Sequence, residues 1–391
     1  MNHHLHPSRA LPLDHASAVL VGRAWVDGQG PVLVRVQGDG VTDLSRLAPT
    51  CSALLELDDV ARRVREHDGA RLGETAAFLA NSAAGAVGPS GPRLLAPCDL
   101  QAIKAAGVTF VASMLERVIE EQARGDAARA ESVRKAIVAV IGDNLARIRP
   151  GSPEAARLKE VLIAQGAWSQ YLEVGIGPDA EVFTKSQPMS AVGTGADVGI
   201  HPKSEWNNPE PEVVLAVNSR GEVVGATLGN DVNLRDFEGR SALLLGKAKD
   251  NNASCAIGPF IRLFDDGFGI DDVRGCELSL EVVGPEGFQM RGASSLAAIS
   301  RDPLDLVAQT IGANHRYPDG FVLFLGTMFA PTQDRFGPGQ GFTHAVGDVV
   351  TVSTPRLGTL ANRVVHSDEA APWTYGAGAL MRDLARRGLL A

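Results

Sequence analysis

Apolar and polar positions alternate along residues 18–44, where VLVGRAWV and PVLVRVQG flank the turn-rich DGQGP. This period of two places successive side chains on opposite faces of a strand, so the region predicts a β-hairpin or a small sheet. The following stretch LLELDDVARRVREH, residues 54–67, is predicted to be helical. Residues 81–97, NSAAGAVGPSGPRLLAP, have the composition of a linker. We therefore place a domain boundary near Leu94.

The rest of the chain divides into a helical part and a β-rich part. From Leu100 to about Ile148, apolar residues recur every three or four positions through VTFVASMLERVIEEQ and VRKAIVAVIGDNLARI, which predicts helices. Beyond Tyr171 the sequence pattern changes to short runs rich in β-branched residues, separated by Gly, Pro, Asn and Asp: EVVLAV, GEVVGATLG, CELSLEVVG, DGFVLFLG and DVVTVSTP. This half predicts a β-rich body and not a doubly wound sheet.

Composition narrows the class of protein. The 391 residues are 45% apolar and 21% charged, which is ordinary for globular protein, and the net charge of −9 without a basic stripe disfavours nucleic acid as a partner. The four cysteines are far apart and fit a reducing compartment. The longest apolar stretch, FVLFLGTMFA, is too short to span a bilayer. We expect a cytoplasmic protein that acts without a membrane.

Two glutamates open one of the apolar strands. Glu210 and Glu212, in WNNPEPEVVLAV, lie two residues apart, so both side chains share one face of a strand. Asp231, in LGNDVNLRD, follows the returning strand, and the turn NSRGE makes residues 212 and 231 hairpin neighbours. Hard oxygen ligands of this kind select Mg²⁺, Mn²⁺ or Ca²⁺. The alternative interpretation is a solvated strand edge.

Several familiar catalytic signatures are absent from the chain. It contains no HExxH, GxSxG or GxxxxGK[ST], and GTGADVG has the wrong glycine spacing for a dinucleotide loop. Zinc hydrolases, serine hydrolases and nucleotide-dependent enzymes are therefore disfavoured.

Four ordered segments resemble one family. The runs PEPEVVLAV, GNDVNLRDFEG, GKAKDNNASCAIGPF and FLGTMFAP, the last followed by HAVGDVVTVSTPRLGTLAN, are similar to the fumarylacetoacetate hydrolase superfamily, and closest to its 2-keto-3-deoxy sugar acid dehydratases. The resemblance implies an α+β fold: a β-rich catalytic domain over residues 94–391, a mixed β-roll or sandwich with flanking helices. Residues 1–93 would form a small N-terminal α/β domain and linker. The family also implies a homodimer or homotetramer.

The resemblance also implies a set of site residues. Metal ligands for Mg²⁺, with Mn²⁺ as the alternative, are expected at Glu210, Glu212 and Asp231, with Glu181 as a fourth. Catalytic residues are expected at Lys247, Glu238 and Arg235, and substrate-binding residues at Lys185 and Thr327. Thr327 has a second interpretation, as a turn-capping residue after a buried strand.

Departures from the hydrolases point to the reaction. The segment VTFVASMLERVIEE has no histidine where related enzymes place their water activator, whereas Glu238 adds an ionisable group after NDVNLRD. Loss of water from a 2-keto-3-deoxypentonate, such as 2-keto-3-deoxy-D-xylonate, to give 2,5-dioxopentanoate in pentose catabolism needs an acid and a base but no external nucleophile. Glu238 is the first candidate for one of these roles, ahead of Lys185 and Glu116. The alternatives are a C–C hydrolase or decarboxylase of a 2,4-dioxo acid, and a non-catalytic binding protein with a structural cation.

Overall fold

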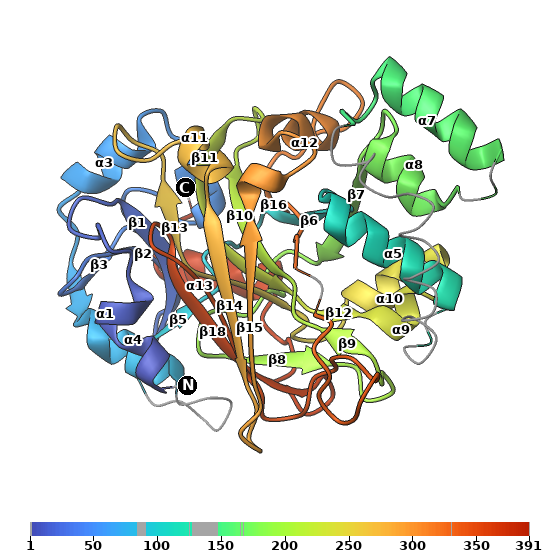
Figure 1. The fold of residues 1–391 in the computed structure, drawn as a ribbon. Helices are drawn as coiled ribbons and strands as arrows, with labels where there is room; N and C mark the ends of the chain where they lie inside the picture. The colour runs from blue at the N-terminus through green and yellow to red at the C-terminus, as the bar shows by residue number, and fades with distance from the viewer. Residues whose placement is uncertain are drawn as a thin grey trace.

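Two large β-sheets form the body of the molecule, and helices surround them (Figure 1). The structure, a computed structural model, describes residues 2–83, 91–124, 126, 148–164, 166, 168–329 and 331–390. In the described part the larger sheet has eleven strands in the order β4-β3-β2-β1-β13-β11-β10-β16-β6-β7, with β5 paired to β1. These strands are β1 (Leu20–Val26), β2 (Gly30–Val36), β3 (Val41–Asp43), β4 (Arg71–Gly73), β5 (Arg93–Leu95), β6 (Ala102–Gly107), β7 (Glu181–Ser186), β10 (Pro211–Val217), β11 (Val223–Asp231), β13 (Cys255–Leu263) and β16 (Phe321–Phe324).

The second sheet has five described strands in the order β15-β14-β17-β18-β8. They are β8 (Asp197–Ile200), β14 (Glu277–Val283), β15 (Gln289–Ser295), β17 (Val349–Thr354) and β18 (Gly358–His366), and a separate short pair joins β9 (Asn207–Asn208) to β12 (Asn233–Leu234). The β-branched runs predicted as strands beyond Tyr171 are therefore confirmed in β10, β11, β14, β16 and β17.

The helices lie mainly at the two ends of the larger sheet, with α1–α4 at one end and α5, α7 and α8 at the other (Figure 1). They are α1 (Pro7–Ala10), α2 (Cys51–Leu55), α3 (Val60–Glu66), α4 (Thr75–Ala83), α5 (Val111–Ala123), α7 (Pro153–Ala164), α8 (Gln170–Ile176), α9 (Arg235–Glu238), α10 (Leu245–Lys249), α11 (Ile270–Arg274), α12 (Pro303–Thr310) and α13 (Ala377–Arg386), with 3-10 turns η1 (Asn2–Leu5), η3 (Ala242–Leu244) and η4 (Leu296–Ala298).

Strand β10 lies in the middle of the larger sheet and is buried along its whole length. Val213 and Leu215 face the core shared with the five-stranded sheet, where Leu280 and Val352 pack. Val214 faces the opposite way, into the cluster of strands β6 and β16. Because both faces are covered, the strand reads as a continuous apolar run and not as an alternating one. Polar side chains at its entry are consequently cut off from water.

The N-terminal residues form part of the larger sheet. The predicted hairpin is confirmed, with β1 and β2 in register from Leu20↔Val36 to Val26↔Gly30. The other edge of β1 pairs with β13, which belongs to the second half of the chain. One apolar cluster unites residues of β1, β2 and α2 with residues of β13. The division into domains at residue 93 stays a prediction, although the backbone pairing crosses it.

Two helix predictions need correction. The helix predicted over residues 54–67 is interrupted, because α2 ends at Leu55 and α3 starts at Val60, with Asp59 at φ 51° between them. Aspartate tolerates that left-handed conformation better than most residues. The predicted helical region from Leu100 begins instead with strand β6, which pairs with β16 and β7 on its two edges. Helix α5 then confirms the helix over 111–123, and residues 133–147 lie outside the described residues.

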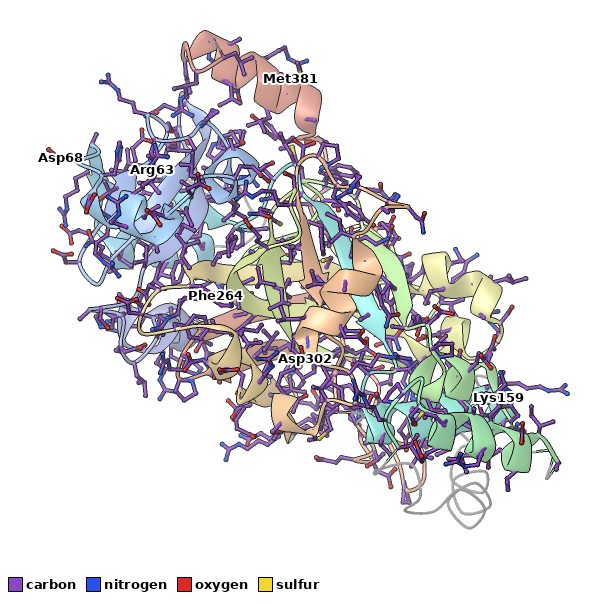
Figure 2. All side chains as sticks on the ribbon, turned by 90° about the horizontal axis from the view of Figure 1, so that it is seen from above. Arg63, Asp68, Lys159, Phe264, Asp302 and Met381 are labelled. Atoms are coloured by element: carbon purple, nitrogen blue, oxygen red, sulfur yellow. The ribbon has the colours of Figure 1, made fainter. Side chains whose placement is uncertain are left out.

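The molecule is elongated when seen from above (Figure 2). Arg63 and Asp68 lie at one end, on the N-terminal part, and Lys159 of α7 lies at the other end. Among the described residues, no helix combines the length and the apolar character that crossing a bilayer requires.

We predict that residues 94–391 alone do not form a stable protein. Removing residues 1–93 takes β1 from β13 and uncovers Ile261 and Leu263, which leaves an unpaired, apolar strand edge. Circular dichroism during thermal melting of the truncated chain should show no sharp transition, or the chain should be insoluble. A soluble fragment with a cooperative melt would show that the N-terminal part is an independent domain.

Candidate metal centre and active site

Three carboxylates meet where strands β10 and β11 run side by side. Glu210 lies directly before β10, Glu212 lies within it, and Asp231 is the last residue of β11. The Asp231 N–H donates to the Glu210 carbonyl oxygen at 3.0 Å. Each of the three residues offers a carboxylate oxygen within 4.8 Å of those of the other two. The predicted proximity of residues 212 and 231 is therefore confirmed, and their arrangement suits binding of a single ion.

The three side chains are buried at 4%, 2% and 1% exposure. Burial, together with the nearby carboxylates of Asp231 and Glu210, raises the pKa of Glu212 well above its ordinary value. Like charges removed from water need a proton or a cation to be stable. Carboxylate oxygens are the donors that Mg²⁺, Mn²⁺ and Ca²⁺ prefer. The donor set, its spacing and the electrostatic strain on Glu212 all fit a divalent cation.

The backbone after strand β16 holds the Glu212 carboxylate. The Gly326 N–H donates to Glu212 Oε2 at 2.6 Å. Gly326 has φ +87°, and a Cβ at this position would clash with the Thr109 hydroxyl, so the position requires glycine. The next residue, Thr327, lines the cavity in front of the carboxylates, and its hydroxyl accepts a hydrogen bond from the Phe329 N–H at 3.1 Å. The GT segment thus reaches the site, as the sequence predicts.

Two buried lysines offset part of the negative charge. Lys249 Nζ lies 2.6 Å from Glu210 Oε2 and 3.0 Å from Asp231 Oδ2, and Lys185 Nζ lies 2.8 Å from Asp231 Oδ1. Burial lowers the pKa of Lys249, but the Asp231 and Glu210 carboxylates outweigh it and raise that pKa above its ordinary value. Burial raises the pKa of Asp231, but the two lysines outweigh it and lower that pKa. Lys249 is therefore a cation and Asp231 an anion.

Lys185 supports the site without lining its cavity. Its ammonium group is fully buried and also donates to the carbonyl oxygens of Val232, at 3.1 Å, and Lys249, at 2.5 Å. Lys185 is not among the described residues that line the cavity. The structure therefore brings the predicted substrate-binding Lys185 to Asp231 and to the backbone, and away from the space for substrate.

Helix α10 carries two lysines, and Lys249 reaches the carboxylates where Lys247 does not. The Lys247 side chain is exposed, with Nζ 5.6 Å from the centroid of the Phe237 ring. Residues two positions apart on a helix point about 200° away from each other, so Lys247 and Lys249 cannot both face the same cluster. The sequence prediction of Lys247 thus chose the first lysine of GKAKD and missed the second. The segment GKAKD contains both lysines, so the sequence offered Lys249 as a second candidate for the site.

Arg117, on helix α5, is a further cation that sequence reasoning missed. Its guanidinium group contacts Glu210 Oε1 and donates to Glu238 Oε2 at 2.7 Å. Glu238, at the end of α9, is buried and lines the same cavity as the three carboxylates, and its catalytic role stays a prediction. Glu116, the neighbouring residue named from sequence, forms an ion pair with the buried Arg235 at 3.3 Å. Arg117 is the one basic residue in VASMLERVIEEQA, which is the signal that could have identified it.

Glu181 lines the same cavity from the start of β7. It lies opposite Gly107 of β6, and a Cβ at Gly107 would clash with the Glu181 carboxyl group. Burial, and next the Glu238 charge, raises the pKa of Glu181 to about 7, although Arg117 opposes the shift. Glu181 is not one of the three residues whose oxygens come together, so its role as a fourth ligand stays a prediction. Its raised pKa makes Glu181 a candidate for holding a proton close to neutral pH.

The space in front of the carboxylates is narrow. One cavity of about 20 Å³ contains the carboxylates, Glu181 and Lys249, and a second of about 20 Å³ adjoins it through Arg117 and Thr327. Arg235 lines the second cavity. A cleft of about 480 Å³ lies elsewhere, beside the N-terminal strands and the segment before α13. We assign the site to the small cavities, because the three clustered carboxylates, Glu181 and Glu238 converge there. Among the described residues that line the cleft, the one carboxylate is Asp197, which pairs with Arg363.

A comparison with family models identifies the scaffold. Residues 165–365, just over half of the chain, match the model described as fumarylacetoacetate (FAA) hydrolase C-terminal. The chain belongs to the fumarylacetoacetate hydrolase family. The matched range contains the three carboxylates, Lys249 and Thr327. The resemblance inferred from the ordered motifs is therefore confirmed.

Two curated relatives resemble part of the chain. A probable 2-keto-3-deoxyxylonate dehydratase from Haloferax volcanii is 32% identical over 194 residues, which cover 50% of this chain and 63% of the relative. A 2-dehydro-3-deoxy-D-arabinonate dehydratase from Saccharolobus solfataricus is 29% identical over 184 residues, covering 47% and 58%. In both cases the match spans less than two thirds of the relative's length.

Solved structures share the fold over a longer range. A 2-keto-3-deoxy-D-arabinonate dehydratase in its apo form has a TM-score of 0.62 at 19% identity, covering 89% of this chain and 99% of its own. The same named enzyme complexed with magnesium and 2,5-dioxopentanoate has a TM-score of 0.61 with the same identity and coverage. A fumarylacetoacetate hydrolase from Exiguobacterium antarcticum has a TM-score of 0.51 at 17% identity, covering 89% of this chain and 100% of its own. The predicted β-rich α+β family fold is therefore confirmed.

We predict that Lys249→Met destabilises the metal-free protein and that Lys247→Met does not. Removing the buried Lys249 cation leaves Glu210 and Asp231 under-compensated, a change that typically lowers the free energy of unfolding by about 3–5 kcal/mol. Lys247 is exposed on the same helix, so it is a matched control. Denaturant titration in EDTA should separate the variants, and Mg²⁺ should recover part of the loss. Equal stabilities for the two variants would contradict this account of Lys249.

We predict that Glu181→Gln removes part of the pH dependence of stability in metal-free protein. The pKa of Glu181 is about 7 in the folded protein, against an ordinary value of 4.5. The contribution of the protonated side chain to the free energy of unfolding is therefore fully present below about pH 4.5, and it is lost as the pH rises through 7. Between pH 5 and pH 8 the wild type should therefore lose roughly 2–3 kcal/mol more than the Gln variant. Thermal melts in EDTA test this, with the exposed Glu160→Gln as control. Parallel pH profiles for wild type and Glu181→Gln would refute it.

Proposed function

We propose that this protein is a Mg²⁺-dependent dehydratase that converts a 2-keto-3-deoxypentonate to 2,5-dioxopentanoate. The observation that carries the proposal is the meeting of three buried carboxylates with two further carboxyl groups, Glu181 and Glu238, in one cavity. The first set suits a cation that binds a 2-oxo acid, and the second suits proton transfer. The names of the two curated relatives, and of the magnesium-containing structure with 2,5-dioxopentanoate, support the same reaction.

Elementary chemistry narrows the substrate. In a 2-keto-3-deoxypentonate, C2 is a ketone, C3 is a methylene and C5 is a primary alcohol, so C4 is the only stereocentre. Xylonate and arabinonate of one series differ in configuration at C2 and C3, and neither carbon is a stereocentre in the 2-keto-3-deoxy acid. The names of the two relatives therefore denote the same compound when both belong to the D series. We propose the D configuration, in line with the D-arabinonate name of one relative.

Glu210, Glu212 and Asp231 would hold Mg²⁺, which when bound supplies Lewis-acid polarisation of the 2-oxo acid. Lys249 is a buried cation beside these residues, and it would stabilise negative charge that develops on the oxo oxygen as the C3 proton leaves. Arg117, which contacts Glu210 and Glu238, would offer its guanidinium group to the substrate carboxylate. Thr327 and Arg235 would border the substrate.

Glu238 and Glu181 would divide the proton transfers. Glu238 forms an ion pair with Arg117, which favours its charged form, so we assign Glu238 as the base that removes a proton from C3. Glu181 keeps its proton near neutral pH, so we assign it as the acid that protonates the C4 hydroxyl as the C4–O bond breaks. The electron pair of the C3–H bond forms the C3=C4 double bond and water departs. Tautomerisation of the 5-hydroxy-3-ene then gives the C5 aldehyde.

We predict that the purified protein produces 2,5-dioxopentanoate from 2-keto-3-deoxy-D-pentonate only in the presence of a divalent cation. An aldehyde dehydrogenase coupled to NADP⁺ reduction detects the product, EDTA should abolish the signal, and Mg²⁺ or Mn²⁺ should restore it. Asp231→Asn should weaken metal binding and raise the Mg²⁺ concentration needed for activity, because an amide oxygen lacks the charge that holds a hard cation.

Parallel reactions distinguish the alternatives. The L enantiomer tests the C4 assignment, and a 2,4-dioxo acid tests for C–C hydrolysis or decarboxylation. Turnover of the 2,4-dioxo acid without any dehydration of the pentonate would overturn the proposed function. A homodimer or homotetramer in the cytoplasm remains our prediction for its assembly and location.

A further inference from the structure

A buried hydrogen-bond acceptor without a partner lies beside the metal ligands. Asn208, in β9, is 3% exposed and lines the second small cavity. Its Nδ2 donates to the Pro209 carbonyl oxygen at 3.0 Å, whereas its Oδ1 accepts no hydrogen bond from the described residues. An unpaired polar group in a buried position is unfavourable, because it has lost its hydrogen bonds to water without replacing them. Because buried polar atoms in native proteins are nearly always satisfied, the orphan oxygen points to a donor from outside the chain.

The position of Asn208 indicates which part of a substrate would meet it. The cavity of Asn208 shares Ser113, Arg117, Glu210 and Thr327 with the carboxylate cavity. A molecule whose C1–C2 end lies at Glu210, Glu212 and Asp231 therefore extends its other end toward Asn208. The Arg235 guanidinium, 4.3 Å from the centroid of the Trp206 ring and paired with Glu116, lines the same end and makes it polar.

We propose that Asn208 Oδ1 accepts a hydrogen bond from the C5 hydroxyl of the sugar acid. The inference rests on the proposed function, because it assumes a 2-keto-3-deoxypentonate in the site. The C5 hydroxyl is the donor farthest from the substrate carboxylate, and it is not the group lost as water. An amide oxygen selects for a donor at this position, so Asn208 makes the enzyme specific for 4,5-dihydroxy-2-oxo acids over 5-deoxy analogues.

The neighbouring Asn233 provides a matched control. Asn233 lies opposite Asn208 in the two-stranded pairing of β12 with β9 and is fully buried. In the part of the chain that the structure describes, both polar atoms of its amide lack partners. Unlike Asn208, it is not among the described residues that line either small cavity. Replacing either asparagine by the isosteric leucine disturbs the same pair of strands, but only Asn208→Leu removes an acceptor from the cavity.

The test compares two substrates in three proteins. 4,5-Dihydroxy-2-oxopentanoate carries the C5 hydroxyl, and 4-hydroxy-2-oxopentanoate retains the C4 leaving group but has a methyl group at C5. We expect wild type to prefer the dihydroxy acid by at least about tenfold in kcat/KM, as one hydrogen bond at a buried acceptor is worth about 1.4 kcal/mol or more. Asn208→Leu should lower kcat/KM for the dihydroxy acid by about that factor and leave the 5-deoxy acid within about threefold. Asn233→Leu should retain the wild-type preference.

The outcomes separate this inference from the function on which it rests. If wild type dehydrates neither acid, the proposed function fails and the inference fails with it. If wild type dehydrates both acids equally well, or if Asn208→Leu lowers both by the same factor, the function stands and Asn208 is not the C5 acceptor. The comparison of the two acids in wild type needs no substitution, so a poorly folding variant does not remove the test.

Discussion

The organising constraint of this protein is that three carboxylates share a buried site. Glu210, Glu212 and Asp231 approach one another on adjacent strands, in a region where water cannot screen them. Mutual repulsion and the loss of hydration would destabilise the folded protein unless cations or protons neutralised these charges. Cations compensate the cluster through the side chains of Lys185, Lys249 and Arg117. The raised pKa of Glu212 favours a proton on the third carboxylate. A divalent cation is the ligand that satisfies it most directly.

The fold supplies the compensation from elements that are distant in sequence. Glu210 and Glu212 lie at the start of strand β10, which is covered on both faces, so water is excluded from the carboxylate cluster. Helix α5 contributes Arg117 and helix α10 contributes Lys249, each from its own part of the chain. Gly107 leaves the space that the Glu181 carboxyl group occupies, and Gly326 fits against the Thr109 hydroxyl while its N–H donates to Glu212. The site is thus a consequence of packing around one central strand.

Two nearby carboxyl groups have different electrostatic surroundings. Glu238 is paired with the Arg117 guanidinium, whereas burial and the Glu238 charge dominate at Glu181. An acid and a base on one cavity wall are the minimum that loss of water requires, and a divalent cation would bind the 2-oxo acid between them. On a scaffold shared with hydrolases, the identity of these proton-carrying groups would decide which bond breaks.

The sequence by itself determined the elements with a strong local signal. It predicted the strand runs from EVVLAV to DVVTVSTP and the pairing that brings Asp231 to Glu212, because both depend on side-chain alternation and short turns. Tertiary structure alone decided that Lys249 and not Lys247 meets the carboxylates, that Arg117 joins them, and that β6 is a strand. The reason is physical: a helix rotates by about 100° per residue, and the register and tilt that settle which side chain faces the cluster come from packing against distant segments.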